Sequence, residues 1–272
     1  MTPFDIRATT GDVLLTGITP DRGSNLPQTN PSAPIQTIVT LDGAGFDSST
    51  LVEFVDADGT VFTPSQIRVI SPTRLIANLE LTGWGLGLYD VRVTKGSASA
   101  TLENAFRVAT GQARLETNLV IPSALGFNIP IRQTIWIEYR NTGDAPIPAP
   151  LLYMNGDYEV RITTDASLAI PYRGFAGAPS GVTDSVHVLG KGFGATPWIL
   201  QPGDSGRIPV YYIGLGAPAS YPRITFTLST ITSDDARPID WSSIEPQIRI
   251  AGLDDQDRQH VFALLQLQMG DT

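Results

Sequence analysis

The segment GLYDVRVT, residues 87–94, decides the fold class of this chain. In an extended strand Tyr89, Val91 and Val93 point to one face, and the side chains between them point to the other. That period of two is typical of a β-strand with one buried face and one exposed face. Further short strands are expected over residues 51–55, 60–62, 67–71 and 75–79. Several short alternating strands at this spacing predict a β-sandwich.

A turn separates the first two of these additional strands. Residues 56–59 read DADG, and Asp and Gly tolerate the positive φ angles of tight hairpins. We therefore expect a hairpin at this position.

The composition agrees with an all-β fold and excludes several functions. Hydrophobic residues make up 42% of the 272 residues and charged residues only 17%, which is below the usual ~25%. The net charge of −9 provides no basic surface for nucleic acid and disfavours anionic membranes. No apolar run reaches the ~20 residues of a membrane span. The absence of cysteine excludes disulfides and thiol chemistry.

Four linked segments carry a resemblance to a known family. They read ITPDRG at 18–23, VTLDGAGF at 39–46, GLYDVRV at 87–93 and LENAFRV at 102–108. Their order and spacing resemble the IPT/TIG family of immunoglobulin-like domains over residues 14–108. The resemblance implies an immunoglobulin-like sandwich and no particular chemistry, because such modules occur in surface receptors, bacterial adhesins, polysaccharide enzymes and transcription factors.

A second strand-rich segment occupies residues 114–235. Within it, IEYRNTGD at 137–144 and LQPGDSG at 200–206 resemble the CARDB-like group of bacterial immunoglobulin-like adhesion modules. That group pairs an N-x-G turn with a later L-x-P-G-x-S turn. The resemblance implies a second β-sandwich, so we expect tandem immunoglobulin-like sandwiches.

The two ends of the chain differ from these modules. Residues 1–13 contain FDIRATTG, which resembles YDVRVTKG at 89–96. This similarity indicates either the last strand of a preceding module or a chance likeness of two strands. Residues 236–272 form a C-terminal extension with an expected helix over about 254–268, because acidic residues begin it and apolar residues recur at helical spacing. The expected apolar face comprises Val261, Leu264, Leu265 and Gln268, with Phe262 and Met269 beside it.

The candidate catalytic groups do not form a recognisable set. GDSG at 203–206 matches the nucleophile motif of trypsin-like proteases, but such an enzyme needs a His base oriented by an Asp. His187 lies only eighteen residues before Ser205 and lacks the sequence context of that family, and His260 lies on the expected helix. We therefore interpret 203–206 as a turn. A hydrolase would need a His, an acid and a hydroxyl to converge in a cleft.

Two ligand sites are conceivable from the sequence. Trp84, in the loop sequence TGWG, is the best candidate for an exposed ring on which a sugar stacks. Asp234 and Asp235 lie between expected elements and could offer oxygen ligands to Ca²⁺. No histidine or cysteine spacing of a zinc site is present. The only cofactor that the sequence leaves open is therefore Ca²⁺.

These observations predict a non-catalytic, structural or adhesive fragment of a large bacterial secreted or cell-surface protein. Its partners would be neighbouring modules of the same parent chain, and a glycan or protein ligand; nucleic acid and membrane insertion are not expected. The alternative is a carbohydrate-binding accessory module of a polysaccharide-acting enzyme. An exposed row of aromatic side chains would distinguish the alternative from the first hypothesis.

Overall fold

The structure, a computed structural model, describes residues 12–26, 36–123, 132–157, 160–170, 181–192, 197–215, 224–231, 237–245 and 255–271. The chain divides into two units, which we describe separately. The first comprises Met1–Leu115, Asn141–Pro148 and Gly192–Asp204, and the second comprises Glu116–Arg140, Ala149–Lys191 and Ser205–Thr272. Strands dominate both units, so the prediction of an all-β fold with a short C-terminal helix is confirmed.

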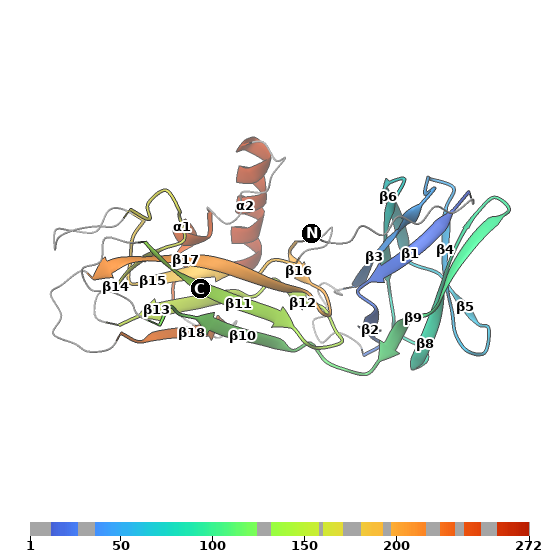
Figure 1. Ribbon diagram of the computed structural model, residues 1–272, viewed down its shortest axis with the longest axis horizontal. Helices are drawn as coiled ribbons and strands as arrows, with labels where there is room; N and C mark the ends of the chain where they lie inside the picture. The colour runs from blue at the N-terminus through green and yellow to red at the C-terminus, as the bar shows by residue number, and fades with distance from the viewer. Residues whose placement is uncertain are drawn as a thin grey trace. The chain divides into compact units, whose positions relative to one another are not determined.

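The first unit contains eleven of the described strands. These are β1 (Leu14–Thr19), β2 (Arg22–Ser24), β3 (Thr37–Ala44), β4 (Leu51–Val55), β5 (Val61–Phe62), β6 (Gln66–Ser71), β7 (Arg74–Leu79), β8 (Gly87–Lys95), β9 (Ala98–Ala109), β12 (Ile147–Pro148) and β16 (Ile199–Leu200). They build two large sheets, with strand orders β1-β3-β7-β6 and β2-β9-β8-β4-β5, and a small β12–β16 pair (Figure 1).

This strand order is that of an immunoglobulin-like sandwich. The chain begins in one sheet, where β1 pairs antiparallel with β3, and then crosses at a cis Thr19–Pro20 bond. It enters the other sheet, where β2 pairs parallel with β9. Near the start of β8 the Tyr89 hydroxyl donates to the Gly85 carbonyl at 2.9 Å, which is the tyrosine corner of such sandwiches.

The core of the first unit lies between its two large sheets. Tyr89, Val91 and Val93 of β8 are at most 1% exposed, as their alternation predicts. They face Val39 and Leu41 of β3, which are fully buried in the same cluster. Burial of these apolar side chains is the main favourable contribution to folding of the sandwich.

The expected hairpin at 56–59 is confirmed. Asp56 Oδ1 accepts hydrogen bonds from the backbone N–H groups of Asp58 and Thr60, at 3.0 and 2.8 Å. Gly59 has φ +82°, a conformation that its lack of a Cβ allows. The turn therefore joins β4 to β5.

Two later segments, Asn141–Pro148 and Gly192–Asp204, belong to the first unit, although we expected them inside the second sandwich. Asp144, in the first of them, accepts ion pairs from Arg22 at 3.0 Å and Arg107 at 3.1 Å. In the other segment, Gln201 Oε1 accepts a hydrogen bond from the Ile38 backbone N–H at 3.3 Å. The contiguous boundaries expected at 108 and 114 therefore differ from the observed division.

The second unit is also a sandwich. Its strands are β10 (Leu115–Val120), β11 (Gln133–Asn141), β13 (Leu151–Gly156), β14 (Val160–Thr163), β15 (Ser185–Leu189), β17 (Ser205–Leu215) and β18 (Phe226–Thr230). They form two sheets with orders β10-β11-β17-β14 and β15-β13-β18. Ile135 and Ile137 of β11 are fully buried, and Tyr212 of β17 meets Phe226 of β18 edge-on at 6.4 Å. The latter contact joins the two sheets across the core.

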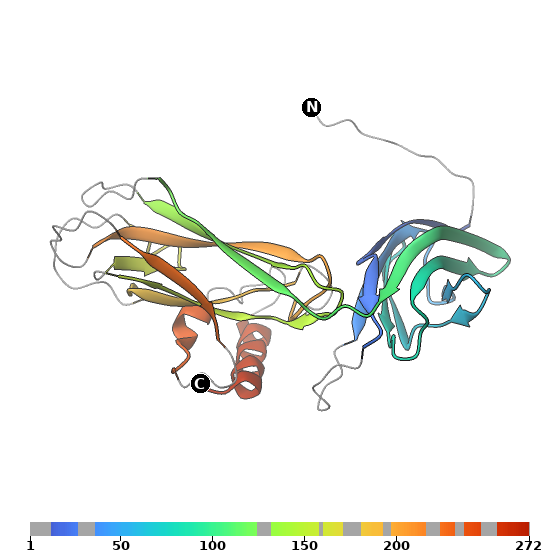
Figure 2. The ribbon, with the colours of Figure 1, turned by 90° about the horizontal axis from the view of Figure 1, so that it is seen from below.

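Two helices complete the second unit. α1 (Trp241–Ile244) follows β18, and α2 (Asp255–Met269) agrees with the helix expected over about 254–268. Figure 2 shows the two helices side by side. The ring of Trp241 in α1 meets that of Phe262 in α2 edge-on, with 5.9 Å between the ring centroids. The expected apolar face is partly wrong, because Leu264 is 45% exposed. Phe262, which lies beside the expected face, makes the contact with Trp241.

Candidate functional site

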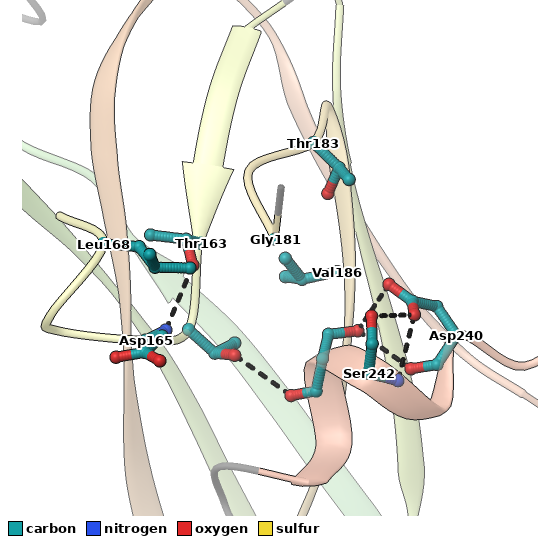
Figure 3. Close-up of a pocket in the computed structure, with 10 residues that line it drawn as sticks. Thr163, Asp165, Leu168, Gly181, Thr183, Val186, Asp240 and Ser242 are labelled. Carbon is teal, nitrogen blue, oxygen red and sulfur yellow. Dashed lines mark hydrogen bonds between the residues drawn. The ribbon is translucent and has the colours of Figure 1, made fainter. Parts of the chain in front are cut away.

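A pocket of about 390 Å³ lies in the second unit, at one end of its three-stranded sheet. Its walls come from three segments: the end of β14 and the turn after it, the start of β15, and α1. Figure 3 shows Leu168 and Thr163 on one side and Asp240 and Ser242 on the other.

The first wall begins where β14 ends. Asp165 Oδ1 accepts hydrogen bonds from the Ser167 backbone N–H at 2.8 Å and from its hydroxyl at 2.7 Å. This Asp-centred turn places Leu168 against Ala169, Val182 and Ile213. Leu168 therefore gives the pocket an apolar side backed by a small cluster.

The second wall is the entry to β15. The backbones of Ile162 and Thr183 exchange two hydrogen bonds, at 2.8 and 3.1 Å, which hold Thr183 beside β14. The Thr183 hydroxyl donates to the Ser185 carbonyl. Val186, which is 2% exposed, forms the floor of the pocket between the first and third walls.

The third wall is α1, whose first turn is capped by Asp240. Asp240 Oδ1 accepts from the Ser242 backbone N–H at 3.1 Å and from its hydroxyl at 2.5 Å. The Ser243 hydroxyl lies 2.9 Å from Asp240 Oδ2 and 3.0 Å from the Asp240 carbonyl oxygen, so its one proton is shared between them. Aspartate is a favoured N-cap because its carboxylate satisfies N–H groups that have no partner within the helix.

The pKa of Asp240 is set by two opposing influences. Burial is the largest of them and raises the pKa, but hydrogen bonds from Ser242 and Ser243 together lower it below the ordinary 3.8. Asp240 is therefore ionised at neutral pH.

The structure brings His187, Asp240 and Ser243 together, which the sequence analysis did not foresee. The backbone N–H of His187 donates to the Ser243 hydroxyl at 3.1 Å, and the Asp240 backbone N–H donates to His187 Nδ1 at 3.1 Å. Both His187 and Ser243 are buried, at 5% and 9% exposure. One sequence signal was present, the D-x-S-S pattern of a capped helix at 240–243. No spacing rule connects that pattern with a histidine 53 residues earlier.

The connections among these three groups are not those of a catalytic triad. In a triad the hydroxyl donates to the imidazole, and the imidazole donates to the carboxylate. Here the Ser243 hydroxyl donates to Asp240 directly, and the imidazole accepts a backbone N–H at Nδ1. The arrangement connects β15 with α1. The Nδ1 atom of His187 already accepts the Asp240 N–H, so it does not act as a general base toward the Ser243 hydroxyl.

The GDSG segment is a turn, as interpreted from the sequence. Gly203 has φ +86°, and the backbone N–H of Asp204 donates to the Gln201 carbonyl at 3.0 Å. Ser205 starts β17 and pairs with Arg140 of β11.

The expectation that Trp84 offers an exposed ring is corrected. Trp84 is 7% exposed, and its ring centroid lies 4.7 Å from Phe62, 5.4 Å from Tyr89 and 5.6 Å from Phe54. The loop turns inward through Gly83, which has φ +85°. A sugar cannot stack on a ring whose surface is already covered by core aromatics.

The calcium site expected at Asp234 and Asp235 lies outside the described residues. Most of the expected N-terminal strand within residues 1–13 lies outside them too. Among the residues that the structure does describe, no group of three or more His, Cys, Asp or Glu side chains could hold a metal ion. None of the described helices is long and apolar enough to cross a membrane.

Comparisons with known proteins place the chain in no family. No family model matches it, and no curated protein matches it. Among solved structures, a tetra-tandem repeat in the extending region of a large adhesion protein is 12% identical, with a TM-score of 0.21, and covers 79% of this chain. The chain spans about half of that protein, 49%.

Two further solved structures are similar at the same level. The protein SGBP-B from a complex xyloglucan utilization locus in Bacteroides uniformis is 13% identical with a TM-score of 0.25, and the match covers 80% of this chain and 72% of that one. A protein of unknown function from Porphyromonas gingivalis W83 is 13% identical with a TM-score of 0.19, covering 73% and 83%. Likenesses of this size support no conclusion about the function of the chain.

Proposed function

We propose that this chain is a non-catalytic, load-bearing and adhesive fragment of a large bacterial secreted or cell-surface protein. In this proposal the first sandwich is an IPT/TIG module, which residues 14–108 resemble, and the second sandwich is a CARDB-like module whose strands lie within residues 114–235. Neighbouring modules of the same parent chain are its first partners. The sequence motifs support the bacterial and extracellular setting, and one feature of the first sandwich supports the mechanical role.

That feature is the parallel pairing of β2 with β9. Arg22, Gly23 and Ser24 stand opposite Arg107, Val108 and Ala109. Two backbone hydrogen bonds bracket the pair: Arg107 N–H to the Asp21 carbonyl at 2.8 Å, and Asn25 N–H to the Ala109 carbonyl at 3.0 Å. β2 lies near the start of the first sandwich and β9 is its last large strand.

Parallel strands at the start and end of a domain resist tension well. A force that pulls β2 toward the N-terminus and β9 toward the C-terminus acts along the strands, in opposite directions. All hydrogen bonds between the two strands are then strained together, whereas an antiparallel pair pulled from one end opens one bond at a time. Forced unfolding depends on the barrier to this first rupture. The β2–β9 pair is therefore suited to carry load.

The bonding of the polar groups supports a non-catalytic role. Asp240 and Ser243 cap α1, and His187 binds the backbone of Asp240. These groups connect β15 with α1 and do not form a nucleophile with its base. Treatment of the whole chain with a fluorophosphonate should therefore leave Ser243 and Ser205 unlabelled.

Single-molecule stretching of the whole chain between its two ends tests the mechanical role. Asn25→Pro removes one N–H donor from the β2–β9 pair, so the first sandwich should unfold at clearly lower force than in the wild type. Asn25→Ala is the matched control, because it keeps the N–H and loses only the side-chain bond to the Trp84 carbonyl at 2.9 Å. Equal unfolding forces for the Pro and Ala variants would reject the load-bearing role.

The carbohydrate-binding alternative has lost its main support, because Trp84 is buried. A glycan array still separates the two functions. Saturable binding to a polysaccharide, unaffected by Asn25→Pro, would favour the accessory module over the load-bearing fragment.

A further inference from the structure

The pocket between β14, β15 and α1 has two chemically different sides. Leu168 and Val186 provide apolar surface, and the Asp165 carboxylate lies beside Leu168 on the same wall. Across from Leu168 lies the carboxylate of Asp240, with the Thr183 hydroxyl above it (Figure 3). A ligand that matches both sides needs a short apolar part and a polar end.

The hydroxyl protons on the polar side are already used within the protein. Each Ser or Thr hydroxyl has one proton to donate. Thr164 donates to the Ser243 carbonyl at 3.0 Å, Thr183 to the Ser185 carbonyl, and Ser242 to Asp240. Ser243 donates to Asp240 as well. These oxygens therefore offer lone pairs to a ligand, and no protons.

The charge on the polar side is negative. Asp240 is ionised, and the described residues that line the pocket include no Lys, Arg or His. His187 lies behind the wall, and its Nδ1 accepts a hydrogen bond, which requires a lone pair and hence a neutral ring. A wall of acceptors with a carboxylate fits a group that carries several N–H donors, a positive charge and no acceptor.

We propose that this pocket binds a primary alkylammonium group, with the ammonium at Asp240 and the alkyl chain against Leu168. The ammonium ion has three donors and no acceptor, and charge-assisted hydrogen bonds to a carboxylate are stronger than neutral ones. The proposal goes beyond the load-bearing role and does not depend on it, since the pocket lies in the second unit and the β2–β9 pair in the first. Free amines and lysine side chains of another protein share this chemistry.

A ligand series on the whole wild-type chain tests the proposal without any mutation. In an NMR titration, n-butylammonium should shift the backbone amide signals of Gly181, Thr183 and Ser242 in a saturable manner. n-Butanol has the same shape without the charge, and tetramethylammonium has the charge without N–H donors, so both should bind at least about tenfold more weakly. Equal binding of n-butanol or tetramethylammonium, or no saturable shift with n-butylammonium, would overturn the proposal.

A second arm distinguishes the two sources of the ammonium group. Nα-acetyl-lysine amide presents the same ammonium on a peptide backbone. If it shifts the same three amides as n-butylammonium, a lysine of another protein can reach the site. If n-butylammonium alone binds, the site takes free amines.

Three variants complete the test. Asp240→Asn should weaken n-butylammonium binding about tenfold or more, because the negative charge is lost. Asp157→Asn is the matched control, since Asp157 accepts from the Thr225 backbone N–H at 2.8 Å in the same unit but does not line the pocket. Thr183→Val keeps the wall's shape and removes one acceptor, so it should weaken binding even if Asp240→Asn disturbs α1. Unchanged binding in a folded Asp240→Asn chain and in Thr183→Val would contradict the site.

Discussion

His187 Nδ1 accepts a hydrogen bond from the backbone N–H of Asp240 at 3.1 Å. In the reverse direction, the backbone N–H of His187 reaches α1 through the Ser243 hydroxyl. A β-strand and a short helix are thereby joined by two bonds that each use one side chain and one backbone group. Because α1 has only four residues, these bonds contribute much of what holds it in place.

Ser243→Ala should destabilise the second unit by about 1–3 kcal/mol, because it leaves the buried N–H of His187 without its acceptor. Ser242→Ala is the matched control. Ser242 is exposed and its backbone N–H still reaches Asp240, so the loss should stay within about 0.5 kcal/mol. Urea unfolding followed through Trp136 and Trp241 fluorescence measures both. Equal losses in the two variants would contradict the structural role of Ser243.

Tyr212→Phe should leave the second unit as stable as the wild type at neutral pH, or slightly more stable. The Tyr212 side chain is 2% exposed, and its hydroxyl has no hydrogen-bond partner within the part of the chain that the structure describes. A buried unpaired hydroxyl costs about 1–3 kcal/mol, and this substitution removes it. Tyr139→Phe is the contrasting variant, because its hydroxyl donates to the Lys191 carbonyl at 2.9 Å. A larger loss at Tyr212 than at Tyr139 would show that the buried hydroxyl is bonded.

The same tyrosine should make the second unit sensitive to alkali. Burial raises the Tyr212 pKa from 10.0 to about 12. The unfolded chain therefore loses the proton first, so this contribution to stability is complete below pH 10.0 and is lost as the pH rises toward about 12. Urea titrations between these pH values measure it. In Tyr212→Phe this part of the pH dependence should disappear, and its persistence would assign the effect to another group.

The ion pair between Asp47 and Lys95 should make the stability of the first unit depend on pH under acid conditions. The hydrogen bond from Lys95, and next the hydroxyl of Ser49, lower the Asp47 pKa from 3.8 to about 2. The contribution of ionised Asp47 to stability is therefore present above pH 3.8 and is lost as the pH falls to about 2. The pair is partly exposed to solvent, so the effect should shrink at high salt.

An NMR titration of the Asp47 carboxyl carbon measures this pKa directly. Lys95→Met should move it back toward 3.8. Arg74→Met, which removes an exposed partner of a different first-unit aspartate, Asp42 at 2.8 Å, should leave it unchanged. An unaltered midpoint in Lys95→Met would contradict the predicted pairing.

Gly206→Ala should destabilise the second unit by about 1–3 kcal/mol through overpacking. A Cβ at this position would overlap the ring and hydroxyl of Tyr139, which stands directly opposite on β11. Gly17→Ala is the control, because nothing lies within 4 Å of a Cβ there. Thermal unfolding of both variants checks this prediction, and a neutral Gly206→Ala would mean that Tyr139 can move aside.

Local patterns predicted most strands but not how the segments are grouped. The alternation in β8 and the turn at 56–59 depend on neighbours in the chain, and both are as expected. Asn141–Pro148 groups with the first unit, where Asp144 forms ion pairs with Arg22 and Arg107. Those partners are far apart in sequence, and no periodicity links them.

The candidate site shows the same limit. Trp84 was assigned to an exposed loop from its glycine neighbours, yet it packs between Phe54, Phe62 and Tyr89. Glycine neighbours indicate a turn but not whether the turn faces inward or outward. The pocket itself was not foreseen, because its walls come from segments about 20 and 55 residues apart.

The sequence by itself determined that this protein is built of β-strands with one buried face, since a period of two along an extended backbone sorts apolar and polar side chains to opposite sides. It also determined the turns, because Asp and Gly act on the backbone within a few residues. Only the tertiary structure decided which polar groups meet, as in His187 with Asp240 and Ser243. It alone decided that β2 runs parallel to β9. Such contacts depend on how sheets stack, and stacking depends on the shape of the whole core rather than on any one stretch of chain.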